Sequence, residues 1–212
     1  MIKAIELQNF KCFDHLQLPL AELTILAGGN AAGKSTVMQA LLLADATARE
    51  KGDSVDASEA LGVAVGSPKA LVSQNRTELP EGDFSLKVQW NEQSVIFTYR
   101  IDKLQPLKLT YSQSESTQTD RLFYLNAERL GPRISYPAGV DEEILRDGAN
   151  AAFLIDRADI QQRRVPGCLV LAGESSKFSI QVENWMNAIL GDVNFSVTTD
   201  YVKAITDIRY GN

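Results

Sequence analysis

Histidine and cysteine are scarce in this chain of 212 residues. His15 is the single histidine, and the two cysteines, Cys12 and Cys168, do not form a metal-binding spacing. A Ser-His-Asp triad or a histidine-rich metal site would therefore need His15 itself, which we expect to be a solvated loop or strand residue. The two thiols are typical of reduced cysteines in a cytosolic protein.

Long apolar runs and an excess of positive charge are missing as well. No stretch approaches the ~20 apolar residues of a membrane-spanning helix, and the first residues lack the apolar core of a signal peptide. We therefore expect a cytoplasmic protein with no membrane partner. Because 27 acidic residues outnumber 21 Lys and Arg, the formal net charge is −6. This charge argues against a surface that coats nucleic acid, although it is compatible with a local basic patch.

The most informative segment that the chain does contain is a glycine-rich loop. Residues 28–35 read Gly-Gly-Asn-Ala-Ala-Gly-Lys-Ser, which meets the pattern G-x-x-x-x-G-K-[ST]. Gly28 and Gly33 allow backbone angles that a Cβ would forbid, so that backbone N–H groups can converge on phosphate oxygens. Lys34 can reach the β- and γ-phosphates, and the Ser35 hydroxyl can hold Mg²⁺. The sequence therefore predicts a site for a nucleoside triphosphate.

The flanks of this loop are those that the motif requires. Residues 23–27 form a short apolar run that predicts a buried strand. Residues 37–43 are mainly good helix formers without glycine or proline, and we expect that helix to run to about Glu50. The helix N-terminus adds partial positive charge beneath the phosphates. The predicted nucleotide-binding residues of the loop are Gly28, Asn30, Ala31, Ala32, Gly33, Lys34, Ser35 and Thr36, with Ser35 also a metal ligand.

Apolar periodicity along the rest of the chain predicts an α/β protein. Strands are expected at residues 2–7, 15–20, 107–111, 122–125, 194–198 and 201–208, and a hairpin at residues 84–90 and 95–101. Residues 141–159 are largely helical in pattern, with a break near Gly148, and residues 178–190 predict an amphipathic helix that ends at Gly191. Residues 52–68 are polar, small and glycine-containing, which predicts a loop or a poorly ordered segment.

Two segments resemble a known family. Ile5-Glu6-Leu7-Gln8-Asn9-Phe10-Lys11-Cys12-Phe13, the strand after it and the phosphate loop resemble the N-terminal lobe of ABC-type ATPases of the RecF and structural-maintenance-of-chromosomes group. Residues 123–133 resemble a bacterial AAA-family, overcoming-lysogenization-defect-like subgroup, whose members are commonly found in phage-defence systems. The resemblance implies one P-loop NTPase lobe over residues 1–212, with a mixed sheet around the loop's helix, an antiparallel β subsheet and a helical segment.

The resemblance also implies ATP and Mg²⁺ as ligands, and it assigns roles to residues outside the loop. Lys11 corresponds to a lysine that lies near the nucleotide in the family, although a solvated turn lysine is the alternative. Gln74 is the candidate for a glutamine that reaches Mg²⁺ and the attacking water. Glu128 and Arg129 follow a predicted strand, where they form either a structural ion pair or part of the nucleotide site.

The family hydrolyses ATP with parts that this chain does not show. An acidic motif, four apolar residues followed by Asp-Glu, should hold Mg²⁺ and polarise water. The nearest runs end in Asp156 followed by Arg157, in Asn126, or in Gly173-Glu174. A Ser-Gly-Gly-type loop, which faces the partner's ATP in the family's dimers, is also absent. We therefore expect binding without a complete catalytic set, as in the N-terminal portion of a longer ATPase.

Three functions remain to be weighed. The first is an ATP-binding module whose ATP-dependent dimerisation and hydrolysis gate a DNA-linked or antiphage effector. It implies a homodimer or larger ATPase assembly, an effector nuclease or toxin, and DNA as partners. The alternative is a scaffold subunit of a defence complex that binds ATP without hydrolysing it. A small P-loop kinase or GTPase is the weakest option, because the guanine-reading run Asn-Lys-x-Asp does not occur.

Overall fold

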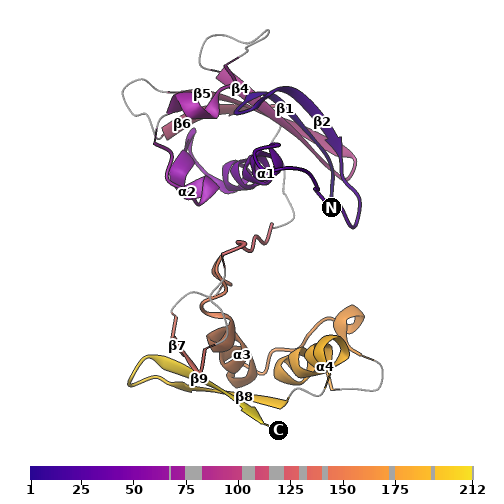
Figure 1. Cartoon of the computed structure of the whole chain (residues 1–212), viewed down its shortest axis with the longest axis vertical. Coiled ribbons are helices and arrows are strands. Elements are labelled where there is room, and N and C mark those ends of the chain that lie inside the picture. Colours follow the sequence, from indigo (N-terminus) through magenta and orange to yellow (C-terminus); the bar gives the residue numbers. More distant parts are fainter. Residues whose placement is uncertain are drawn as a thin grey trace. The chain divides into compact units, whose positions relative to one another are not determined.

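The computed structural model describes residues 1–66, 68–74, 83–101, 108–114, 122–128, 133–139, 143–171, 175–191 and 194–211. The chain divides into two compact units, residues 1–123 and residues 124–212 (Figure 1). Each unit combines an antiparallel sheet with helices, so the predicted α/β class is confirmed.

The first unit is a six-stranded antiparallel sheet with its helices on one side (Figure 1). The strand order is β2-β1-β4-β5-β6-β3. The strands are β1 (Ile2–Phe10), β2 (Phe13–Pro19), β3 (Ser54–Asp56), β4 (Asp83–Trp90), β5 (Gln93–Ile101) and β6 (Lys108–Gln113). The helices are α1 (Lys34–Arg49), α2 (Ala57–Leu61) and the short 3-10 turn η1 (Pro68–Leu71). The predicted hairpin and the predicted helix after Lys34 are both confirmed.

The core of this unit lies between the sheet and α1. Alternation along the strands buries one face of the sheet, and the aromatic rings of Phe10, Phe84 and Tyr99 form a continuous row there, with centroids 5.1 and 4.8 Å apart. The Tyr99 hydroxyl lies 2.8 Å from the Thr47 hydroxyl of α1 and joins the helix to the sheet. Burial raises the pKa of Tyr99, so this hydroxyl stays protonated and the link persists at all moderate pH values.

The predicted buried strand at residues 23–27 is wrong. The segment belongs to neither sheet, and Leu23 and Ile25 are each 78% exposed. Leu26, by contrast, packs against the core. An apolar run becomes a buried strand only when other strands lie beside it, and the described residues provide none at this place.

The predicted loop at residues 52–68 is also wrong in part, because it contains β3 and α2. Asp56 caps α2 through a hydrogen bond of 2.9 Å from the Glu59 backbone N–H to its carboxylate. Gly62, with φ +66°, ends the helix. These two residues are helix start and stop signals, and the small polar composition around them concealed a helix of only five residues.

The second unit consists of a three-stranded antiparallel sheet, in the order β7-β9-β8, with helices on one side (Figure 1). Its elements are β7 (Ser135–Pro137), α3 (Ala151–Ile160), the 3-10 turn η2 (Gly167–Leu169), α4 (Phe178–Leu190), β8 (Asn194–Asp200) and β9 (Ile205–Gly211). The predicted helix at residues 178–190 and the two last strands are confirmed. In the part of the chain that the structure describes, none of the helices has the length and apolar character to cross a bilayer.

Two predictions fail in this half of the chain. Residues 122–125 form no strand, and Phe123 and Leu125 are 66% and 46% exposed. The pattern expected to be helical from residue 141 forms a helix only beyond the predicted break near Gly148, where α3 begins at Ala151. The side chain of Asn150 instead holds the preceding residues in a turn, because it donates to the Glu143 carbonyl at 2.7 Å and accepts from the Leu145 N–H at 2.8 Å. Residues 140–142 lie outside the described residues.

Candidate nucleotide-binding site

The phosphate loop is exposed where it extends away from the core, and it ends at the start of α1. Residues 27–32 are exposed, and Gly28, Ala31 and Gly33 have φ values of +152°, +62° and +88°. A left-handed alanine is uncommon and costs energy, and such strain is concentrated at functional sites. Helix α1 begins at Lys34 without a side-chain cap. Its first backbone N–H groups are therefore available to an anion, which the helix dipole also favours.

The side chain of Lys34 lies inside the curve of this loop. Its ammonium donates to the carbonyl oxygens of Gly28 and Gly29, at 2.8 and 2.6 Å. The loop is thus wrapped around a positive charge at its centre. Ser35 is exposed in the first turn of α1, and Thr36 follows it half-buried. This geometry brings the predicted loop residues together as one anion-binding surface.

The turn between β1 and β2 covers the last glycine of the loop. A Cβ at Gly33 would lie 2.4 Å from Cζ of Phe13 and 3.0 Å from Sγ of Cys12. The sulfur of Cys12 also lies 3.6 Å from the Thr36 hydroxyl. Only glycine fits at position 33, for steric reasons as well as for its left-handed φ. Phe13 and Cys12 were not predicted as site residues, although the resemblance placed Lys11 of the same segment near the nucleotide.

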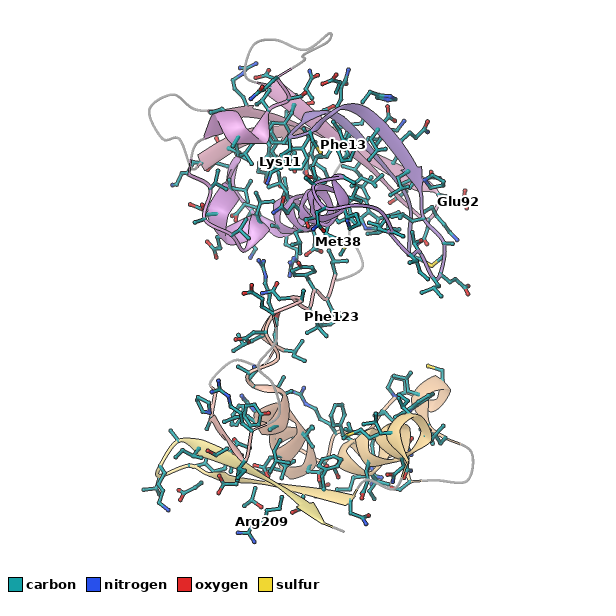
Figure 2. The ribbon with its side chains drawn as sticks, viewed as in Figure 1. Lys11, Phe13, Met38, Glu92, Phe123 and Arg209 are labelled. Atoms are coloured by element: carbon teal, nitrogen blue, oxygen red, sulfur yellow. The ribbon has the colours of Figure 1, made fainter. Side chains whose placement is uncertain are left out.

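Lys11 lies in the same turn and reaches α1. Its ammonium donates to Oε1 of Gln39 at 2.7 Å and lies 5.9 Å from the centre of the Phe10 ring. Figure 2 labels Lys11 and Phe13 in the first unit, together with Met38 of α1. Gln39 is four residues after Ser35, so both lie on one face of α1. Lys11 is half-buried rather than fully solvated, and burial lowers its pKa. A nucleotide role for Lys11 stays a prediction.

Gln74 follows a segment that is bonded to this turn. The Lys11 N–H donates to the Leu71 carbonyl at 3.0 Å, and the Ser73 N–H donates to the Asn9 carbonyl at 2.8 Å. Gln74 itself is exposed, directly after Ser73. The structure therefore brings the Gln74 segment to the turn that carries Lys11 and Phe13. The metal role of Gln74 stays a prediction.

The donor set around the loop fits a magnesium-bound triphosphate. Mg²⁺ prefers oxygen ligands, keeps several waters, and is usually held by one or two protein groups plus phosphates. The Ser35 hydroxyl and the Gln74 amide oxygen are ligands of that kind. Across the described residues no cluster of three or more His, Cys, Asp or Glu is placed to hold a metal. The cation would therefore depend on the phosphates for most of its coordination.

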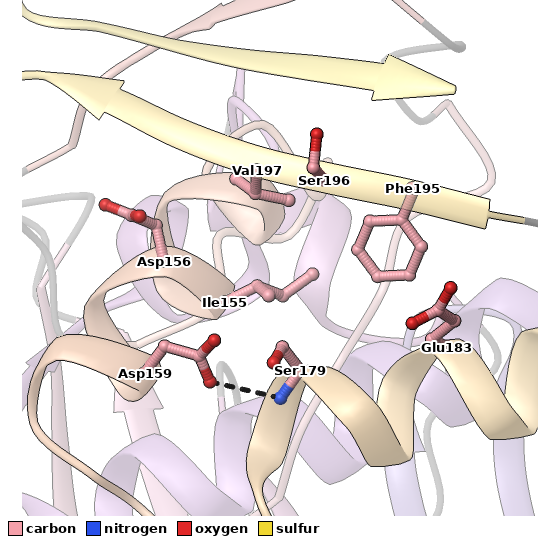
Figure 3. Close-up of a pocket in the computed structure, with 8 residues that line it drawn as sticks. All are labelled: Ile155, Asp156, Asp159, Ser179, Glu183, Phe195, Ser196 and Val197. Carbon is pink, nitrogen blue, oxygen red and sulfur yellow. Dashed lines mark hydrogen bonds between the residues drawn. The ribbon is translucent and has the colours of Figure 1, made fainter. Parts of the chain in front are cut away.

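A cavity of about 200 Å³ in the second unit has the opposite electrostatic character (Figure 3). Asp156 and Asp159 of α3 and Glu183 of α4 line it, beside Phe195 of β8. Asp159 accepts a hydrogen bond from the Ser179 N–H at 3.3 Å and pairs with Lys177 at 2.9 Å. Because three carboxylates repel phosphate and no basic side chain is among the described lining residues, this cavity does not suit a nucleotide.

The other acidic candidates add nothing to the site. Asp156 lies within α3, in the helical setting that its sequence predicted. Glu128 is exposed, whereas Arg129 and Glu174 lie outside the described residues. The two alternatives for the Glu128 and Arg129 pair therefore stay open.

Comparison with known proteins gives two findings. The family model of the AAA ATPase domain matches residues 1–162. An OLD nuclease from Thermus scotoductus (strain ATCC 700910 / SA-01) is 42% identical over 41 residues, which are 19% of this chain and 8% of the nuclease. The family match contains the whole phosphate loop, the β1–β2 turn and Gln74. The matched segment of the nuclease is only a small part of that protein.

Proposed function

Because the chain belongs to the AAA ATPase domain family, we propose that it binds ATP with Mg²⁺ at residues 28–36. The observation that carries this proposal is the position of Lys34, at the centre of a loop that ends in an uncapped helix N-terminus. Fixed N–H groups, a helix dipole and one ammonium together recognise the phosphates of a nucleotide. Lys11 would add a second positive charge from the β1–β2 turn.

We infer further that ATP acts here as a signal for assembly. Phosphoryl transfer is catalysed mainly by positioning and charge stabilisation, and the loop has the groups for positioning but no catalytic acid. Asp14, the acidic residue next to the turn, is bonded to Ser73. Efficient hydrolysis would then require an acid from another segment or subunit, brought to the site by an ATP-dependent homodimer or larger assembly.

The likeness to the OLD nuclease supports a connection to DNA or to an effector nuclease. The likeness covers 8% of that protein, so an antiphage or DNA-linked role is a proposal for this chain. The net charge of −6 disfavours tight non-specific DNA binding by these residues alone, because that binding depends on Lys and Arg neutralising phosphates. A partner would have to supply the nucleic-acid contact.

The alternative proposal is a scaffold that binds ATP and never hydrolyses it. The incomplete catalytic set favours it as much as it favours completion by a partner. Steady-state ATP hydrolysis separates the two: a scaffold stays inactive with every partner from the same assembly, whereas a completed ATPase gains turnover when that partner is added. An ATP-binding scaffold would still require Lys34.

Titration calorimetry with Mg-ATP tests the shared premise. We expect Lys34→Ala to weaken binding by roughly 10- to 100-fold, because hydrogen bonds to charged groups contribute about 1.5–3 kcal/mol each. Lys3→Ala, which removes an exposed lysine of β1, is the matched control and should bind as the wild type does. Absence of nucleotide binding by the wild-type chain would overturn the proposal.

A further inference from the structure

Two neighbouring side chains at the start of β2 point to different partners. Phe13 packs on Gly33 of the phosphate loop, and the carboxylate of Asp14 accepts a hydrogen bond from the Ser73 hydroxyl. Successive side chains of a strand point to opposite sides, so one dipeptide can contact both segments. The chain of contacts runs from Gly33 through Phe13 and Asp14 to Ser73, and Gln74 is the next residue.

The backbone around this contact is fixed as well. Asn9 and Lys11 have φ values of +57° and +53°, and these two residues exchange hydrogen bonds of 2.8 and 3.0 Å with Ser73 and Leu71. Phe10 and Val72 form an isolated antiparallel bridge between them. Left-handed conformations at two non-glycine residues cost energy. Such conformations persist only when contacts with the surrounding structure enforce them. The cost is offset here by the contacts to residues 71–73.

Burial makes the Asp14–Ser73 contact energetically important. Ser73 is only 3% exposed and Asn9 only 1%, whereas Gln74, one residue later, is exposed. A hydrogen bond lost at so buried a position is not replaced by one to water, so its loss costs more there than at the surface. The segment is therefore firmly held up to Ser73, and the first exposed side chain beyond this anchor is that of Gln74.

We propose that Asp14 and Ser73 are positioning residues, which hold Gln74 at the phosphate loop so that its amide oxygen reaches the Mg²⁺ of bound ATP. The inference rests on the proposed ATP site and deepens it. It implies that the start of β2 has two tasks: Phe13 supports the loop that holds the phosphates, and Asp14 fixes the segment that serves the metal. Neither Asp14 nor Ser73 touches the nucleotide in this arrangement.

The test compares ATP affinity in EDTA with ATP affinity in Mg²⁺, by calorimetry on the full chain. Removing a residue that orients a metal ligand typically lowers metal affinity about 10- to 100-fold. We therefore expect Ser73→Ala and Asp14→Ala each to lower the Mg²⁺-dependent gain in affinity by about tenfold, while affinity in EDTA stays within about twofold of wild type. Asp14→Asn keeps an oxygen that accepts from Ser73 and should restore the gain.

Matched controls separate positioning from general stability. Ser85→Ala removes a comparable serine of β4, whose hydroxyl bonds Gln8 at 3.4 Å, and should leave both affinities unchanged. The double variant Asp14→Ala/Ser73→Ala should be no worse than either single variant, because the two residues act as one contact.

Three outcomes would overturn the inference. Equal losses with and without Mg²⁺ would show that the contact only supports the loop. An unchanged Mg²⁺ gain in both alanine variants would show that Gln74 is not positioned by it. Failure of the wild-type chain to bind ATP in either buffer would instead refute the proposed function itself. Lys34→Ala, which should weaken binding roughly 10- to 100-fold in both buffers, shows that the binding measured is that of the phosphate loop.

Discussion

The two units of this chain are stabilised in different ways. In the first, the large side chains of Phe10, Phe84, Phe97 and Tyr99 are buried to 1% exposure or less. In the second, the buried apolar side chains among the described residues are those of Ala152, Phe153 and Ala158. Burial of apolar surface contributes roughly 25 cal/mol per Å², so the first unit has a core of its own and the second has little of one.

Polar contacts stabilise the second unit, which has no large apolar core among its described residues. The buried residue of α4 is Gln181, whose side chain accepts from the Leu171 N–H at 3.0 Å and donates to the Ser175 carbonyl at 2.6 Å. Meanwhile Trp185 and Ile189 of the same helix are 42% and 75% exposed. An amphipathic helix normally buries its apolar side. A helix that the sequence predicts correctly, such as α4, can therefore leave apolar side chains exposed.

The largest effect should come from emptying the core of the first unit. Phe84→Ala removes a ring that is 0% exposed and packs between two other rings, and it should cost about 3–5 kcal/mol of unfolding free energy. Trp185→Ala, at the half-exposed position in α4, should cost only about 1 kcal/mol. Urea denaturation of both variants measures this. Equal costs would contradict the comparison and show that Trp185 is buried in solution.

The second prediction compares two glycines of nearly equal φ, Gly33 at +88° and Gly191 at +87°. The two glycines differ in ψ. Gly33, at ψ 5°, is left-handed, which costs alanine about 1–2 kcal/mol, whereas Gly191, at ψ −165°, lies in a region that is essentially restricted to glycine and costs alanine about 1–3 kcal/mol. Only at Gly33 does the new Cβ also meet a ring, at 2.4 Å from Phe13, and overpacking adds about 1–3 kcal/mol. Gly33→Ala should therefore be the more destabilising variant by urea denaturation, whereas nothing lies within 4 Å of a Cβ at Gly191.

A double variant isolates the steric part. Phe13→Ala in the Gly33→Ala background should recover the overpacking cost but not the cost of the left-handed backbone. If the loss of unfolding free energy in the double variant equals the sum of the losses in the two single variants, Phe13 does not pack on Gly33.

The third prediction concerns the acid sensitivity of the second unit. Burial raises the pKa of Asp159, but hydrogen bonds from Ser179 and Lys177 outweigh it, and the pKa lies below its ordinary value of 3.8. A carboxyl whose folded pKa is lowered stabilises the protein above its unfolded pKa, and this stability is lost as pH falls through the folded pKa. Asp159→Asn should thus cost about 1 kcal/mol at pH 7, with the difference from wild type shrinking below pH 3.8.

Thermal unfolding at pH 7 and at acidic pH checks this dependence. Asp156→Asn is the matched control on the same helix, because among the described residues that carboxylate accepts only a long hydrogen bond of 3.5 Å from Tyr201. A difference for Asp159→Asn that is the same at both pH values would contradict the assigned cause.

What the sequence could predict depended on how local the cause is. The phosphate loop and α1 follow from adjacent residues, and the hairpin of β4 and β5 follows from strict alternation of apolar and polar residues. All three were therefore predictable. The contacts of Lys11 with Gln39 and of Phe13 with Gly33 join residues 28 and 20 positions apart, and no local pattern encodes them. The segment at residues 23–27 failed for a related reason, since its composition is that of a strand but a strand requires a neighbour.

The smallest effect on stability, and the finest comparison, involves the exposed apolar residues of the two units. Ile25 is 78% exposed in a segment that no described strand pairs with, and Ile189 is 75% exposed on α4. Replacing either by threonine should change the unfolding free energy by no more than about 0.5 kcal/mol. Self-association, measured by sedimentation velocity, should nevertheless fall more for Ile25→Thr. An unpaired segment offers backbone hydrogen bonds as well as apolar surface to another chain, whereas α4 satisfies its own backbone and offers apolar surface alone. A larger decrease for Ile189→Thr would show instead that the uncovered helix of the second unit, rather than the segment before the phosphate loop, is where this chain meets its partners.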